Sequence, residues 1–157
     1  PFVHIPRGYG GLHEEVAAEA TLDGIDQLLP LLQGRGRALA ALLERFAGAK
    51  TLGVVGLPFA GKTLLSRDLE RAARARDRTL EVLDDPVGAD LARCDALIGI
   101  TASEATLVRR ARGQRVGVAP VEALMEALPA ARARLASLTG AILIDGDNPL
   151  DLMIERA

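Results

Sequence analysis

Eight consecutive residues near the middle of the chain have the types and the spacing needed to hold phosphate groups. They are Gly56, Leu57, Pro58, Phe59, Ala60, Gly61, Lys62 and Thr63. Glycine at the first and sixth positions permits backbone angles and a close approach that other residues resist, so backbone amides can point at phosphate oxygens. The lysine adds a mobile cation, and the threonine hydroxyl can face Mg²⁺. The eight residues therefore predict a loop that binds the phosphates of a nucleotide.

The residues on either side of this loop provide the context that phosphate binding requires. Residues 52–55 form an apolar run typical of a strand, and Leu64, Leu65 and Leu69 mark one face of a helix that follows. The positive end of that helix would face the bound anion. Loop and context together resemble the Walker A motif of the P-loop NTPase superfamily, and the resemblance extends over residues 50–157. It implies a nucleoside triphosphate held by the eight loop residues and Leu64, with Lys62 also active in catalysis.

Phosphoryl transfer also needs a carboxylate that helps to hold Mg²⁺, usually at the end of a neighbouring strand. Asp84 and Asp85 follow one apolar run, and Asp145 follows another. Each of these residues could instead build a turn. The helix after the loop leads directly into the strand that ends at Asp84, so we expect Asp84 or Asp85, together with Thr63, to hold the metal in preference to Asp145.

The second half of the chain is similar to small-molecule kinases of the nucleoside monophosphate and shikimate types. Residues 95–112 run from an apolar strand through a small-residue turn and a glutamate to several arginines, and residues 141–146 look like the closing strand of these kinases. The resemblance implies that arginines compensate charge on the transferred phosphoryl group. The candidates are Arg109, Arg110, Arg112 and Arg115. In the alternative interpretation this helix simply has a solvated basic face.

Two further function classes remain open. Residues 85–88 fit the Asp-x-x-Gly pattern of GTPases, but the guanine signature of that family needs a late lysine, and none follows Lys62. We therefore expect ATP as the nucleotide, with GTP as the weaker alternative. The short stretch between the second and third predicted strands leaves no room for a standard acceptor-binding domain. That shortness favours a regulatory nucleotide-binding module without turnover as the main alternative to an enzyme.

Short apolar runs alternate with longer helical stretches after residue 50, which predicts an α/β fold. The expected architecture is a small three-layer sheet of about five mainly parallel strands. The predicted strands cover residues 51–55, 79–83, 96–101, 115–119 and 141–144. The predicted helices cover residues 62–76, 103–112 and 121–138, with a short one after Pro149. We assign residues 50–157 to a nucleotide-binding domain.

Residues 1–49 have a different pattern and are assigned to an extended arm followed by a helical preamble. Prolines and glycines dominate residues 1–11, whereas apolar residues recur at helical spacing from residue 12 to residue 47. Gly34 and Gly36 predict a break between two of these helices. The apolar stripe of the last helix predicts that the preamble docks on the sheet domain, and the segment is also a candidate site for a protein partner.

Composition limits the partners and the compartment. The chain has 19 basic and 21 acidic residues, so it has no strong electrostatic field that would attract nucleic acid. Only 3% of its residues are aromatic, so it has few side chains on which bases could stack. A single cysteine, Cys94, cannot form an internal disulfide, and no apolar run is long enough to cross a membrane. We expect a cytoplasmic protein that binds neither nucleic acid nor membrane.

Overall fold

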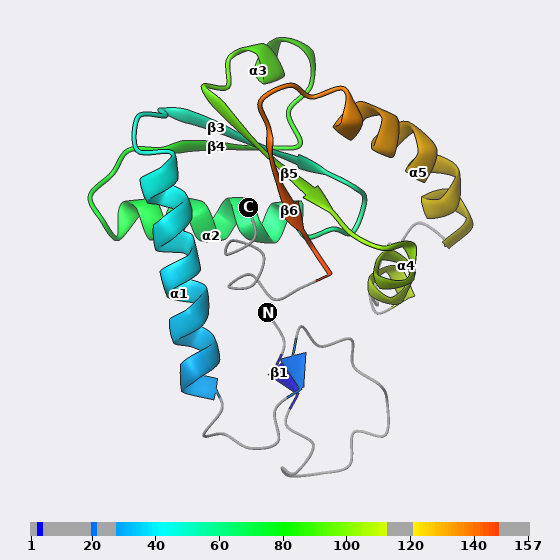
Figure 1. Ribbon diagram of the computed structural model, residues 1–157, viewed down its shortest axis with the longest axis horizontal. Helices are drawn as coiled ribbons and strands as arrows, with labels where there is room; N and C mark the ends of the chain where they lie inside the picture. The colour runs from blue at the N-terminus through cyan, green and yellow to red at the C-terminus, as the bar shows by residue number, and fades with distance from the viewer. Residues whose placement is uncertain (1–2, 5–19, 22–27, 113–120, 148–157) are drawn as a thin grey trace.

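The computed structural model describes residues 3–4, 20–21, 28–112 and 121–147 (Figure 1). In chain order the elements are β1 (Val3–His4), β2 (Ala20–Thr21), α1 (Leu28–Arg45), β3 (Thr51–Gly56), α2 (Lys62–Arg74), β4 (Glu81–Asp84), α3 (Gly88–Ala92), β5 (Ala96–Thr101), α4 (Glu104–Arg112), α5 (Val121–Ala136) and β6 (Ile142–Asp145). From β3 onward one helix, or two between β5 and β6, separates consecutive strands, as the sequence predicts for an α/β fold. No helix among the described residues is long and apolar enough to span a membrane.

The main sheet has four parallel strands in the order β4-β3-β5-β6, and β1 pairs with β2 in a separate two-stranded sheet. These four strands match four of the predicted ones to within two residues, which confirms the α/β class and the parallel sheet. The fifth predicted strand, at residues 115–119, and the short helix predicted after Pro149 lie outside the described residues. Helix α3, between β4 and β5, was not predicted, because its five residues are too few to show a helical period.

The chain leaves the centre of the sheet in two opposite directions. From β3 it crosses through α2 to β4 on one side, and from β5 it crosses through α4 and α5 to β6 on the other side. Because such crossovers are right-handed, opposite directions place the connecting helices on opposite faces of the sheet. Helix α2 contacts β3 and β4, whereas Leu135 of α5 lies against Gly99 of β5. The central strands are consequently buried on both faces.

Helix α1 packs on α2 and runs without interruption through Gly34 and Gly36, so the predicted break is wrong. A glycine inside a helix costs about 0.5–1 kcal/mol relative to alanine, which tertiary contacts can offset. Arg35, between the two glycines, donates from Nε to the Asp68 carboxylate of α2 at 3.1 Å. Further along α1, Leu42 and the neighbouring leucines of the apolar stripe belong to the main core.

The end of α1 is held by one arginine from the segment between α2 and β4. The guanidinium of Arg78 donates to the backbone oxygens of Leu43, Phe46 and Ala49. These carbonyl groups belong to the end of α1 and to the segment after it, where a helix lacks its own donors. The docking predicted for the apolar stripe is therefore present in the structure. The stripe itself packs inside the chain, and a protein partner for residues 1–49 stays a prediction. A strand, β2, also occupies residues 20–21, where helix was expected.

We predict that Gly36→Ala stabilises the protein by about 0.5–1 kcal/mol, because alanine restricts the unfolded chain and favours the helix. Gly36 is exposed, and a Cβ atom there would meet no atom within 4 Å. Gly140→Ala is the matched control: its site is equally open, but its φ of 74° is left-handed, so alanine should cost roughly 1–2 kcal/mol. Urea unfolding of both variants measures whether the free energy of unfolding rises for Gly36→Ala and falls for Gly140→Ala. A Gly36→Ala variant less stable than the parent would contradict the description of α1 as one continuous helix.

Candidate phosphate-binding site

The loop at residues 57–61 leaves the carboxyl end of β3 at the point where strand order reverses. One neighbour of β3 is β4, reached directly through α2, and the other is β5, from which the chain continues away to β6. In open α/β sheets, ligands bind outside the carboxyl ends of the strands at such a reversal. The topology thus places the predicted loop at the position where a ligand site is expected.

The backbone of the loop is curled by two residues with positive φ. Phe59 has a φ of 59° and Gly61 has a φ of 103°. A left-handed conformation costs a bulky residue roughly 1–2 kcal/mol, so it persists at Phe59 only because its surroundings enforce it. Hydrogen bonds from Leu57 N to Ile100 O and from Ala60 N to Leu57 O anchor the loop. Turns of this kind direct successive amides into one concave, anion-binding surface.

The two glycines of the motif are needed for different reasons. A Cβ atom on Gly56 would lie 2.5 Å from the carbonyl oxygen of Ile100, so glycine is required there for the close approach of β3 to β5. Gly61 has open space around it but needs its left-handed φ. Gly61 also precedes α2 and offers no side-chain cap, so the first-turn amides of α2 keep their partial positive charge toward the loop.

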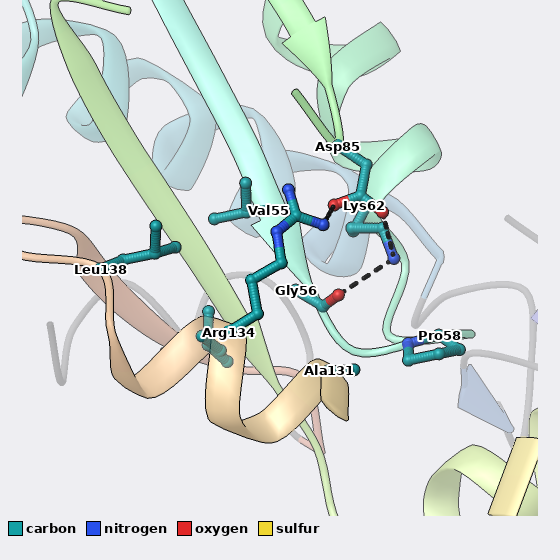
Figure 2. Close-up of a pocket in the computed structure, with 9 residues that line it drawn as sticks. Val55, Gly56, Pro58, Lys62, Asp85, Ala131, Arg134 and Leu138 are labelled. Atoms are coloured by element: carbon teal, nitrogen blue, oxygen red, sulfur yellow. Dashed lines mark hydrogen bonds and ion pairs between the residues drawn. The ribbon is translucent and has the colours of Figure 1, made fainter. Parts of the chain in front are cut away.

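Lys62 lies over the loop, with its charge directed at the loop backbone. Its Nζ atom donates to Gly56 O at 3.1 Å and to Leu57 O at 3.0 Å, and it lies 3.5 Å from Oδ2 of Asp85 (Figure 2). The side chain is only 15% exposed. Because neutral carbonyl groups are its nearest partners, Lys62 can exchange them for the charged oxygens of a phosphate.

The two predicted carboxylates, Asp84 at the end of β4 and Asp85 directly after it, have different partners. Oγ1 of Thr63, in the first turn of α2, donates to Oδ2 of Asp84 at 2.6 Å. Asp85 instead accepts a hydrogen bond from Arg134 of α5 at 3.0 Å and faces Lys62 (Figure 2). Asp84 is the last residue of β4, whereas Asp85 lies after it with a left-handed φ of 53°, so the two neighbouring side chains leave the backbone in different directions. Thr63 and Asp84 therefore form the oxygen pair suited to Mg²⁺, and Asp85 does not join it.

Asp145 lies at the end of β6, which β5 separates from β3. Its Oδ1 atom accepts the backbone N–H of Asp147 at 3.0 Å, so it builds the turn after the strand. Within the described residues, no group of three or more His, Cys, Asp or Glu side chains could hold a metal ion.

Of the arginines that the kinase resemblance gave as candidates, the structure brings Arg110 to the loop. Arg109 and Arg112 are exposed on α4, and Arg115 lies outside the described residues. Arg110, between the first two, donates to Ala60 O at 3.2 Å and to Gly146 O at 2.8 Å. It therefore links the loop to the end of β6 and engages loop carbonyl groups, which makes it a positioning residue.

Arg134 is the site residue that sequence reasoning missed. It lines a small pocket of about 80 Å³ between the loop and α5, together with Val55, Gly56, Pro58, Lys62, Asp85, Ala131, Leu135 and Leu138. A signal for it was present: Arg134 lies three residues after Ala131 and four before Leu138, on the side of α5 that packs inward. Nothing in the sequence showed that this side of α5 would meet the phosphate loop.

Asp147 caps the N-terminus of α4 beside the loop. Its carboxylate accepts the N–H of Ser103 at 2.9 Å and the Ser103 hydroxyl at 3.1 Å. Burial alone would raise the pKa of Asp147, but hydrogen bonds from Ser103 and Thr106 and the nearby charge of Arg110 outweigh it, and the pKa lies below its ordinary value.

Comparison of the chain with models of known protein families, with curated proteins and with solved structures found no match. The case for the site therefore depends on its own geometry.

We predict that Asp147 contributes stability at neutral pH that is lost on acidification. A depressed pKa in the folded state stabilises above the unfolded value, about 3.9, and the stabilisation disappears as the pH falls through the lower folded value. Asp147→Asn should therefore be less stable at pH 7 and should lose less stability than the parent below about pH 4. Urea unfolding between pH 7 and about pH 2 checks this. Asp77 is exposed, and Asp77→Asn serves as the control. If the free energy of unfolding changed with pH in the same way for Asp147→Asn and the parent, Asp147 would not have this stabilising role.

Proposed function

We propose that this protein binds a nucleoside triphosphate together with Mg²⁺ and uses it in hydrolysis or phosphoryl transfer. The observation that carries the proposal is the 2.6 Å hydrogen bond between Thr63 Oγ1 and Asp84 Oδ2. A glycine-rich turn alone could merely join a strand to a helix. Magnesium-dependent phosphate chemistry requires oxygen ligands for the metal next to the phosphates. Thr63 and Asp84 bring two such oxygens together from separate elements, beside a curled loop and a lysine.

In this proposal the loop and the start of α2 hold the phosphates. Backbone amides of residues 57–61 and of the first turn of α2, including Leu64, would donate to phosphate oxygens. Lys62 would give up its contacts to Gly56 O and Leu57 O, which hold it in place before binding. Its charge would then follow the phosphates as negative charge moves on them during the reaction.

Thr63 and Asp84 would hold the magnesium ion, which supplies charge neutralisation at the phosphates. The pair fits a hard cation because both groups offer oxygen, and Mg²⁺ commonly takes only one or two protein carboxylates alongside the substrate phosphates. Asp84 is exposed, so the pair can open toward an incoming ligand. The hydrogen bond between the two residues keeps both oxygens at one point until then.

ATP is the proposed nucleotide, because the chain has no lysine after Lys62 for the guanine signature of GTPases. GTP remains the alternative. Such a protein belongs in the cytoplasm, where a free thiol such as that of Cys94 stays reduced. Between β4 and β5 the chain has only α3 in addition to short connections. This compact crossover favours hydrolysis, or a regulatory module without turnover, over transfer to a large acceptor.

We predict that Lys62→Ala weakens triphosphate binding roughly tenfold or more, because a charge-assisted contact is worth about 1.5–3 kcal/mol. Lys50→Ala is a matched control, since Lys50 is the only other lysine and is exposed. Calorimetric titration with Mg²⁺ and ATP measures both. Equal affinities for the two variants would sink the proposal of a phosphate site.

We predict that Thr63→Ala and Asp84→Asn reduce the advantage that Mg²⁺ gives to ATP binding while sparing the affinity without metal. Asp84→Asn should also lower single-turnover hydrolysis more than affinity, because its contribution grows as charge develops on the phosphates. Asp145→Asn is the control and should change neither. Equal losses with and without Mg²⁺ would contradict the metal assignment. A parent without turnover above the Lys62→Ala background would leave only the regulatory module.

A further inference from the structure

We propose that Arg134 is the residue by which this site distinguishes a triphosphate from a diphosphate. The inference rests on the proposed function, because it assumes that a nucleotide occupies the loop. It concerns a side chain from α5, on the face of the sheet opposite to α2. Neither the loop motif nor the magnesium pair includes this residue.

The first observation is that one carboxylate holds two cations together. Asp85 accepts from Arg134 through Oδ1 at 3.0 Å and faces Nζ of Lys62 through Oδ2 at 3.5 Å. Figure 2 shows the guanidinium and the ammonium group on either side of this carboxylate. Lys62 comes from the start of α2 and Arg134 from α5, so the bridge brings charges from both faces of the sheet to one place.

The second observation is that this bridge is weakly held. The side chains of Asp85 and Arg134 are 39% and 37% exposed, and ion pairs with such exposure contribute little net stability. Asp85 also has a φ of 53°, a left-handed conformation that aspartate adopts at some cost. The other acceptor of Arg134 is the neutral carbonyl oxygen of Pro86. Arg134 can therefore leave both partners for a stronger one.

The third observation is the position of the pocket relative to the loop. Gly56, Pro58 and Lys62 form one side of it, and Arg134 with Leu135 and Leu138 forms the other. The lysine of this motif reaches the β- and γ-phosphates, so the terminal phosphate of a triphosphate would arrive beside Lys62. Arg134 already shares a partner with Lys62 at this point. A guanidinium matches phosphate in geometry and charge better than it matches one exposed carboxylate.

These observations predict an exchange of partners that depends on the terminal phosphate. A triphosphate would take Lys62 and Arg134 from Asp85, whereas a diphosphate ends one phosphoryl group earlier and would leave the pair of Arg134 with Asp85 in place. Arg134 thus adds affinity for the triphosphate alone. Asp85 acts as a competing anion, so its neutralisation in Asp85→Asn should tighten triphosphate binding.

The test is calorimetric titration of a non-hydrolysable ATP analogue and of ADP, both with Mg²⁺, into the parent and three variants. Arg134→Ala should weaken binding of the triphosphate analogue roughly tenfold or more and change ADP binding less than twofold. Arg134→Lys should recover part of the difference, because it restores the charge without the planar fork. Arg132→Ala, an exposed arginine on the same helix, should match the parent for both nucleotides.

The ratio of the two dissociation constants separates this role from a structural one, because a damaged fold would weaken both nucleotides together. Equal losses for both nucleotides in Arg134→Ala, or an unchanged affinity for the triphosphate analogue, would overturn the role of Arg134 while leaving the proposed function intact. A parent that binds neither nucleotide would overturn the proposed function, and this inference with it.

Discussion

The arrangement of the site depends on one constraint, the parallel pairing of β3 with β4 on one side and with β5 on the other. Because parallel strands end at the same edge, this pairing brings the loop after β3 beside Asp84 and beside the backbone of Ile100. The close fit to β5 requires glycine at Gly56, and the hydrogen bond from Leu57 N to Ile100 O then anchors the start of the loop. Because the start of the loop is held in this way, we attribute the left-handed conformation of Phe59 to that anchoring of the backbone.

The end of β4 gives two adjacent carboxylates different partners, because Asp84 closes the strand and Asp85 turns away from it with a φ of 53°. Asp84 meets Thr63 at the start of α2, and Asp85 meets Arg134 of α5. Asp84 therefore lies beside a hydroxyl oxygen from the first turn of α2, whereas Asp85 lies between two cations, Lys62 and Arg134.

Several predictions that depended on local patterns were accurate. The apolar run before Gly56, the leucines after Thr63 and the alternation of short and long segments predicted β3, α2 and the parallel sheet. The break predicted at Gly34 and Gly36 was wrong, because α1 gains more from packing on α2 than two glycines cost. The kinase resemblance gave four arginines as candidates, and of these Arg110 contacts the loop.

What the sequence determined by itself was the order of strand, loop and helix at residues 51–74, because apolar spacing and glycine act through neighbouring residues and backbone angles. The sequence also favoured Asp84 or Asp85, at the end of one predicted strand, as the carboxylate that would hold a metal. Only the tertiary structure decided that Asp84 pairs with Thr63 and Asp85 with Arg134. Those pairs join residues 21 and 49 positions apart. Which partner each carboxylate meets depends on strand order and on the face that each helix covers, and no local pattern in the chain encodes either.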